Sequence, residues 1–217
     1  SFDIRRVANN IWTQSIERFK ESLYFFERYV IEGECYMDLK EETVDSRLIY
    51  KGSFLSLRKD TVKLPNGKTS ERDIVLHPGA VVILAIDDDG YVPMVRQYRT
   101  PVGQVLLELP AGKLEDGEEP LACAVRELAE ETGYSADNFK FLTAFYSTPG
   151  FSTEKLNLFL ATGIHEGVSD TDDDEFIEVE HCKFDELVDM VLKGDVKDAK
   201  TIIGILLVNQ LIKKKLI

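Results

Sequence analysis

The stretch from Gly112 to Tyr134, GKLEDGEEPLACAVRELAEETGY, constrains the fold of this chain more than any other segment. Pro120 suits the first turn of a helix, because the N–H group that proline lacks has no helical partner there. Gly133 is a typical residue just past the end of a helix. We therefore expect a helix from Glu119 to Thr132, about three to four turns long.

The two faces of this predicted helix differ in chemistry. Its expected buried stripe consists of apolar residues at helical spacing: Leu121, Ala124, Val125 and Leu128. Another face carries Glu127, Glu130 and Glu131, whose charges repel one another near the negative end of the helix dipole. A positive group is expected beside them, and converging carboxylates suit a hard divalent ion such as Mg²⁺. A bare Glu-x-x-Glu-Glu triplet is more often only a solvated acidic face.

The residues around the glutamates favour the metal site. Gly112 is followed after five residues by Glu118, and after seven more by Arg126-Glu127-Leu128-x-Glu130-Glu131-x-Gly133-Tyr134. This pattern resembles the Nudix box of hydrolases that cleave nucleoside diphosphates linked to another group. The resemblance implies that Glu118 pairs with Arg126 and braces the loop. Tyr134 stands where an aliphatic residue is usual, and it still fills an apolar position.

The composition is that of a globular protein with a strong acidic excess. The 217 residues are 44% hydrophobic and 30% charged, and their net charge is −13. That length fits one domain with a small appendage. So acidic a chain is not expected to bind nucleic acid or an anionic membrane. Cys35, Cys123 and Cys182 form no disulfide or zinc pattern. Without a membrane-spanning run or a signal peptide, the protein is expected to be soluble and cytoplasmic.

Residues 1–36 are predicted to form a separate helical extension. Apolar residues recur at spacings of four and three from Trp12 to Val30, which indicates an amphipathic helix that must pack against something. Packing on the rest of the chain or on a second subunit is our preferred interpretation. A helix lying on a membrane surface is disfavoured, because five glutamates offset its few basic residues.

From Met37 onward, the pattern predicts strands separated by turns. The expected strands cover residues 48–50, 54–57, 62–64, 72–76, 80–86, 91–97, 104–109, 141–146, 155–161 and 176–179. The Asn-Gly pair at 66–67 indicates a hairpin turn. Helices are expected over 185–193 and 199–212, the second capped by Asp198. Residues 37–217 are therefore predicted to form an α/β (α+β) domain, an α/β/α sandwich around a mixed sheet.

Residues from about 37 to 212 resemble the ADP-ribose pyrophosphatase branch of the Nudix hydrolases. The resemblance rests on Glu108-Leu109-Pro110-Ala111-Gly112 before the box, on Pro149 sixteen residues beyond Gly133, and on an early hairpin that carries Arg72. It implies a Nudix-like fold and Mg²⁺-dependent hydrolysis of ADP-ribose to AMP and ribose 5-phosphate, with Mn²⁺ as a substitute metal. It also implies a homodimer in which strands of residues 37–76 are exchanged.

The same resemblance assigns the metal ligands. Glu127 and Glu131 are expected to bind Mg²⁺ together with the backbone carbonyl of Ala111. Glu130 is expected to support or share a metal and to take part in catalysis. With these ligands in place, the metal would neutralise the diphosphate and lower the pKa of a bound water.

Substrate contacts are expected from two arginines. Arg72 and Arg99 are candidates for the diphosphate, because a guanidinium group can bind phosphate oxygens in pairs. Ordinary surface arginines explain the two residues equally well. Phe54 and Tyr98 are interpreted as core aromatic residues rather than as groups that stack on adenine.

The catalytic base is expected outside the box, because the box carboxylates are committed to metal. The resemblance places such a glutamate on a loop after the proline segment, which here is the polar stretch of residues 162–175. Glu175 is our candidate, because it directly precedes a predicted strand and has the longer reach of a glutamate. For any single residue of this stretch, a solvated acidic loop is the more common outcome.

Two alternatives to an ADP-ribose hydrolase remain open. One is a related hydrolase that acts on another nucleoside diphosphate or on a triphosphate. The other is a nucleotide-sensing module that keeps the fold without catalysis. The complete set of Glu127, Glu130 and Glu131 counts against the sensing module.

Overall fold

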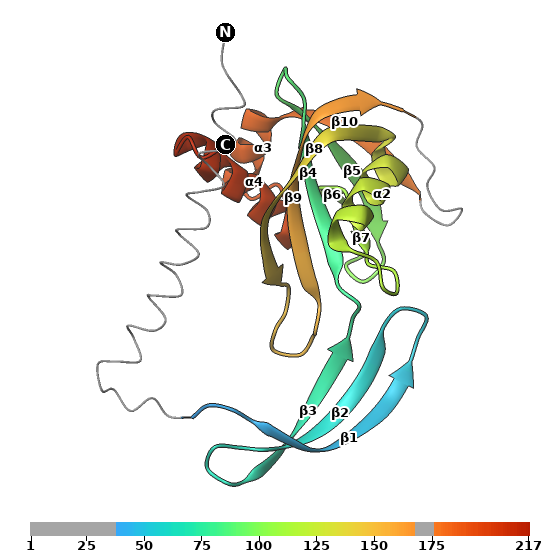
Figure 1. Ribbon diagram of the computed structural model, residues 1–217, viewed down its shortest axis with the longest axis vertical. Helices are drawn as coiled ribbons and strands as arrows, with labels where there is room; N and C mark the ends of the chain where they lie inside the picture. Colours follow the sequence, from blue (N-terminus) through green and yellow to red (C-terminus); the bar gives the residue numbers. More distant parts are fainter. Residues whose placement is uncertain (1–37, 168–175) are drawn as a thin grey trace.

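The computed structural model describes residues 38–167 and 176–217. Its first element is an antiparallel sheet in the order β1-β2-β3, formed by β1 (Glu42–Lys51), β2 (Ser56–Lys63) and β3 (Thr69–Leu76). The predicted Asn-Gly turn joins β2 to β3, with Gly67 at a φ of 81°. This sheet stands at one end of the molecule, below the main body (Figure 1).

The main body contains two further sheets. The central, mixed sheet has the order β7-β4-β9-β8 and consists of β7 (Ala111–Lys113), β4 (Ala80–Ile86), β9 (Lys155–Glu166) and β8 (Tyr134–Tyr146). Only β4 and β9 run parallel, whereas the other neighbours are antiparallel. The last sheet has the order β10-β5-β6, from β10 (Ile177–Lys183), β5 (Tyr91–Arg99) and β6 (Gln104–Glu108).

Strand β4 divides the core between two layers of helices. Because successive side chains of a strand point to opposite faces, its apolar run serves both sides. Val81, Ile83 and Ala85 pack in one cluster with buried residues of α2 (Pro120–Thr132). Val82 and Leu84 pack in the other, with residues of α3 (Phe184–Lys193) and α4 (Ala199–Lys213). This arrangement confirms the predicted α/β/α layering (Figure 1).

Helix α2 ends at the predicted Thr132 and begins one residue later than predicted, at Pro120, and only Ala124 and Leu128 of the predicted apolar stripe are buried. Gly133, at a φ of 74°, ends the helix and donates its N–H to the carbonyl of Ala129. Leu121 and Val125 were expected in the core, yet they are 51% and 47% exposed. The helix is rotated so that the carboxylate of Glu131 turns inward, and that side chain is only 5% exposed.

Strands β8 and β9 are longer than predicted. β8 begins at Tyr134, directly after the helix, and pairs along its length with β9, which continues to Glu166. Residues 162–166 of the predicted loop therefore belong to β9. Backbone hydrogen bonds to β8 hold these residues in a strand although they are largely polar. Glu175 lies outside the described residues, so its predicted role stays a prediction.

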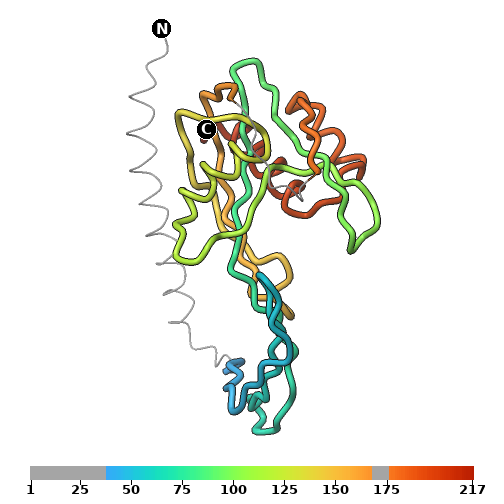
Figure 2. Tube along the Cα trace, turned by 90° about the vertical axis from the view of Figure 1, so that its right-hand side faces the viewer, coloured from blue at the N-terminus to red at the C-terminus, as the bar shows by residue number. Residues whose placement is uncertain are grey.

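The first sheet is attached to the body through the loop between β8 and β9. The N–H of Val75 donates to the carbonyl of Phe151 over 2.7 Å, and the N–H of Thr153 donates to the carbonyl of Val75 over 3.0 Å. Figure 2 shows the sheet projecting from the body beyond this junction. In the described ranges, no helix is long and apolar enough to cross a membrane. The predicted helical extension at 1–36 falls outside those ranges.

Candidate active site

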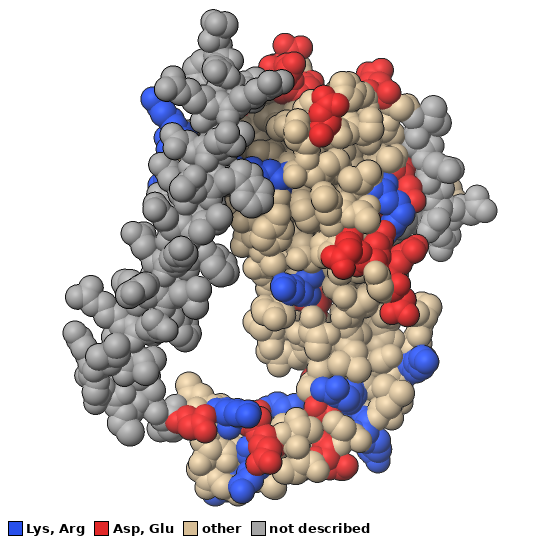
Figure 3. Space-filling view, in the orientation of Figure 1, with Lys and Arg blue, Asp and Glu red and all other residues tan. Residues whose placement is uncertain are grey.

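A cavity of about 570 Å³ lies between α2, the start of α4 and the loop that joins β8 to β9. The acidic residues that line it are Glu115, Glu127, Glu130, Glu131, Glu154 and Asp198. The lysines and arginines that line it are Arg99, Lys113, Arg126 and Lys200. Acidic groups thus outnumber these basic groups, and Figure 3 also shows acidic side chains gathered over the region of α2. A diphosphate would meet net repulsion here unless a cation accompanied it.

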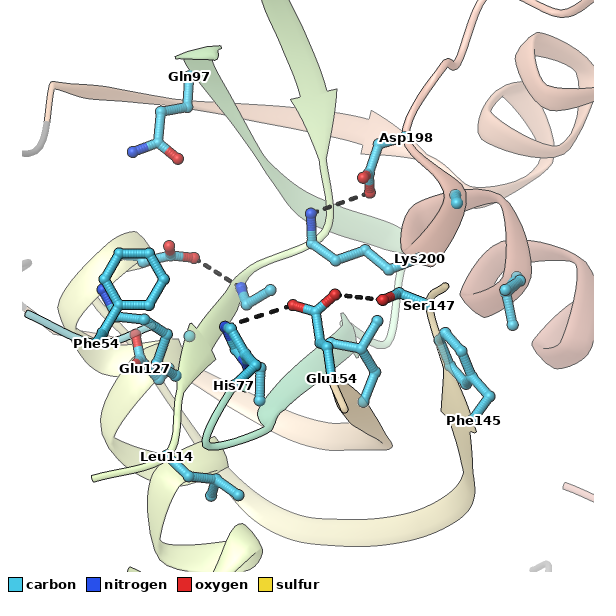
Figure 4. Close-up of a pocket in the computed structure, with 18 of the residues that line it drawn as sticks. Phe54, His77, Gln97, Leu114, Glu127, Phe145, Ser147, Glu154, Asp198 and Lys200 are labelled. Carbon is cyan, nitrogen blue, oxygen red and sulfur yellow. Dashed lines mark hydrogen bonds and ion pairs between the residues drawn. The ribbon is translucent and has the colours of Figure 1, made fainter. Parts of the chain in front are cut away.

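Strand β7 brings Gly112 directly against Glu127. A Cβ atom on residue 112 would lie 1.7 Å from the carboxyl carbon of Glu127, which is far inside van der Waals contact. The glycine of the Gly-x5-Glu pattern is thus required by close packing of the carboxylate on the backbone. This contact places the Glu127 carboxylate at the cavity wall (Figure 4).

Arg126 holds three glutamates of the site together. Its Nε and Nη2 atoms donate to the two carboxylate oxygens of Glu118, each over 3.0 Å. Its Nη1 donates to Glu127 over 2.8 Å and to Glu130 over 2.7 Å. The predicted pairing of Glu118 with Arg126 is therefore confirmed, and hydrogen bonding from Arg126 lowers the pKa of Glu118 to about 2. The guanidinium of Arg126 thus places one positive charge beside Glu127 and Glu130.

Glu131 faces the backbone at the first residue of β7. Its Oε2 accepts a hydrogen bond from the N–H of Ala111 over 2.9 Å, so Ala111 lies beside the glutamate helix as the sequence indicated. A carboxylate this buried is stabilised by such a donor. The interaction brings a backbone segment and the last glutamate of α2 to the same corner of the cavity.

The donor chemistry of this corner fits a hard divalent cation. Carboxylate and carbonyl oxygens are the ligands that Mg²⁺ prefers, and Glu127, Glu130, Glu131 and Ala111 all line the cavity. In the part of the chain that the structure describes, no three acidic, histidine or cysteine side chains are arranged so that they could hold a metal ion. Arg126 engages Glu127 and Glu130, while the Ala111 N–H engages Glu131.

The two candidate arginines lie in different places. Arg99 ends β5, lines the cavity and donates from Nε and Nη2 to the two oxygens of Glu108, both over 2.8 Å. Arg72 lies on β3 and donates from Nε to Glu41 over 2.9 Å. It does not line this cavity in the described chain, so the structure brings only Arg99 to the helix glutamates.

Sequence reasoning missed an aromatic and polar wall of the cavity. Phe54, from the turn between β1 and β2, meets His77 edge to face at 5.8 Å between ring centres, and the Lys113 ammonium lies 4.7 Å from its ring centre. Phe54 and Tyr98 are 48% and 58% exposed, so their interpretation as core residues was wrong. Segments that lie far apart in the sequence form this wall, so no local sequence pattern could predict it.

His77 continues the wall toward the β8–β9 loop. Its Nδ1 accepts the N–H of Gly79 over 3.0 Å, and its Nε2 lies 3.6 Å from Glu154 Oε1. The other oxygen of Glu154 accepts the hydroxyl of Ser147. Burial lowers the pKa of His77, which favours the neutral ring. Figure 4 shows His77, Glu154 and Ser147 in a row, with Lys200 and Asp198 on the α4 side.

Comparisons with known proteins cover most of the chain. Residues 75–203 match the family model described as NUDIX domain, and residues 41–75 match the nucleoside diphosphate sugar hydrolase N-terminal domain. An ADP-ribose pyrophosphatase of Bacillus subtilis is 46% identical over 165 residues, which are 75% of this chain and 89% of that protein. A methanol dehydrogenase activator of Bacillus methanolicus is 40% identical over 168 residues, 76% and 91% of the two chains.

A solved structure shares the fold. A crystal structure described as an ADP compounds hydrolase superposes with a TM-score of 0.72 over 81% of this chain and 96% of that chain. Its sequence identity of 21% supports the fold alone.

Proposed function

The chain belongs to the Nudix hydrolase family, and we propose from this premise that it splits the diphosphate of ADP-ribose into AMP and ribose 5-phosphate. The broader activity, hydrolysis of a nucleoside diphosphate sugar, follows from the family and from both matched domains. The observation that carries the proposal is the packing of the Glu127 carboxylate on Gly112 at the wall of the cavity. The similarity to the Bacillus subtilis ADP-ribose pyrophosphatase supports the choice of substrate.

The chemistry of this reaction demands positioning more than a nucleophile on the protein. Water attacks one phosphorus atom, the bridging oxygen leaves with the other phosphate, and two phosphomonoesters result. The negative charge of the diphosphate must be neutralised in a cavity where acidic side chains outnumber lysines and arginines. Bound Mg²⁺, with Mn²⁺ as a substitute, supplies that neutralisation and acidifies water.

Each residue of the site has a proposed task. Glu127, Glu131 and the Ala111 carbonyl hold the metal, Glu130 supports or shares it, and Arg126 sets the positions of Glu127 and Glu130. Arg99 binds the diphosphate, because it lines the same cavity as the metal-site residues.

Three further parts of the proposal rest on the family resemblance. Glu175 is the catalytic base. Two copies of the chain form a homodimer through the β1–β3 sheet, and Arg72 reaches a substrate in that assembly. The protein works in the cytoplasm on a small nucleotide substrate, without nucleic acid or membrane as a partner.

The test is a product analysis on a panel of nucleotides. The protein is incubated with Mg²⁺ and ADP-ribose, other nucleoside diphosphate sugars, or ATP, and the products are separated and identified. We expect AMP and ribose 5-phosphate from ADP-ribose, with a kcat/KM above that for ATP. A higher kcat/KM for ATP, or for a different nucleoside diphosphate sugar, would replace ADP-ribose as the substrate. A matched incubation with chelator measures the metal requirement.

A further inference from the structure

A buried carboxylate joins β6 to the start of α4 beside the cavity. Glu108 is 1% exposed and accepts hydrogen bonds from both Arg99 and Lys200. Lys200 also donates to Asp198 over 3.1 Å, and its side chain is 13% exposed. Arg99 and Lys200 both line the cavity, so both partners of Glu108 belong to the cavity wall.

Two hydrogen bonds of the Thr201 hydroxyl reinforce the same junction. The hydroxyl of Thr201 accepts the N–H of Leu109 over 2.8 Å and donates to Asp198 over 2.6 Å. Asp198 caps α4 by accepting the N–H of Thr201 over 3.0 Å. The first turn of α4 is therefore fixed to the end of β6, and Lys200 has a defined position relative to Glu108.

Within residues 38–167 and 176–217, the hydrogen bonds of Arg99 to Glu108 occupy one edge of its guanidinium group and leave the other edge available. A guanidinium group carries five N–H donors in a rigid plane, and the Nε/Nη2 edge is the one bonded to Glu108. The Nη1/Nη2 edge is the second edge through which such a group binds phosphate oxygens in pairs. The direction of that second edge is set by the orientation of the Glu108 carboxylate.

We infer that Lys200 is a positioning residue for the diphosphate: by bridging the carboxylates of Glu108 and Asp198, it fixes Glu108 and with it the edge of Arg99 that meets the substrate. This inference deepens the proposed function, because it rests on Arg99 as the diphosphate contact. Lys200 restrains an oxygen of the carboxylate that Arg99 grips, so the guanidinium plane is anchored rather than free to rotate with Glu108. Positioning of this kind strengthens binding without a direct role in bond cleavage.

The test is a double-mutant cycle in the full chain. Lys200→Gln, Arg99→Lys and the double variant are assayed with the nucleoside diphosphate that the wild type cleaves best. We expect Lys200→Gln to raise KM about tenfold with kcat within about twofold, because a contact shared by ground and transition states is weakened. The double variant should be no worse than Arg99→Lys, since Lys200 acts through Arg99. Lys200→Arg keeps the cation and should restore most of the affinity.

Lys197→Gln is the matched control, because Lys197 is an exposed lysine of the same segment that donates to the carbonyl of Gly194. It should leave KM and kcat unchanged. If Lys200 had only a structural role, Lys200→Gln would lower the melting temperature and the fraction of active protein and leave KM unchanged. That result, or additive effects in the cycle, would overturn the inference.

Two further results distinguish a positioning role of Lys200 from a structural role and from a wrong choice of substrate. Lys200→Met keeps the aliphatic stem and replaces Lys200→Gln if the latter does not fold, and failure of both to fold would make Lys200 a structural residue. A wrong substrate is visible in the wild type alone, as cleavage of a compound other than ADP-ribose. The cycle then uses that compound, so the two failures are read independently.

Discussion

The carboxyl carbon of Glu127 lies where it would be 1.7 Å from a methyl group on residue 112. Gly112→Ala must therefore displace the carboxylate, and a misplaced metal ligand should lower kcat by about 100-fold. The steady-state rate at saturating Mg²⁺ measures this effect. Retention of full kcat would mean that the position of Glu127 is unimportant for the reaction.

The control for this substitution is Gly90→Ala in the turn between β4 and β5. Gly90 has a φ of 80°, and among the described residues, its two chain neighbours apart, no atom lies within 4 Å of an added Cβ. The substitution should cost about 1 kcal/mol of stability through backbone strain and leave kcat unchanged. Comparison of Gly112→Ala with Gly90→Ala distinguishes a steric effect at the site from a general loss of folding.

Glu127→Gln and Glu131→Gln should each lower kcat by about 100-fold or more, which corresponds to about 3 kcal/mol of transition-state stabilisation. The physical reason is the loss of an anionic oxygen from the proposed metal site. Glu119→Gln is the control, because Glu119 is exposed at the start of the same helix and makes no side-chain capping bond. Near-normal turnover in both site variants would contradict the metal assignment.

Glu118 should make folding stability depend on pH in the acid range. Hydrogen bonding from Arg126 lowers its pKa from 4.5 to about 2, so the folded state prefers the ionised carboxyl. The stabilisation is complete above pH 4.5 and is lost as the pH falls toward about 2. Urea unfolding at several pH values should show wild type and Glu118→Gln converging across this window. A stability difference that stays constant from pH 7 to pH 2 would rule out this linkage.

A shortened chain that begins at Met37 should fold and keep its kcat/KM within about twofold. The described strands, both packed cores and the cavity lie beyond that residue. Thermal melting and the assay of the proposed reaction check this expectation. Insoluble protein, or loss of a cooperative transition, would show that residues 1–36 belong to the folding unit.

Glu175→Gln should lower kcat by about 100-fold while barely changing Mg²⁺ affinity, as expected for loss of a general base. Glu166→Gln is the comparison, because Glu166 ends β9 and does not line the cavity. The pH–rate profiles from pH 6 to 9 distinguish the two. Full activity of Glu175→Gln beside an inactive variant of a neighbouring acidic residue would move the base to that neighbour.

Periodic apolar segments and helix boundaries were predictable from the sequence. β4 spans the predicted residues, because an apolar run buried on both faces has few other outcomes. α2 ends where Gly133 adopts positive φ, which is the conformation that glycine allows. The start of β8 was missed, because its first residues are polar and gain their order from pairing with β9. Leu121 and Val125 were misassigned, because inward rotation of Glu131 overrides apolar spacing.

The glutamates of the site were predictable, whereas the contact between Glu108 and Lys200 was not. The box pattern placed Glu127, Glu130 and Glu131 on one helix, where spacing alone fixes their common face. Glu108 and Lys200 are separated by 92 positions, and no periodicity relates them. Their contact depends on how α4 meets β6, which is decided by tertiary packing.

Because alternate side chains of β4 belong to different cores, a movement of this strand affects the packing of both helical layers. A displacement that opens space for α2 on one face must push the backbone against α3 and α4 on the other, since close-packed interiors resist compression. The glutamates of α2 and the Lys200 turn of α4 therefore cannot adjust independently. Strands β4 and β9, whose alternate side chains enter both cores, therefore fix the spacing between α2 and the start of α4.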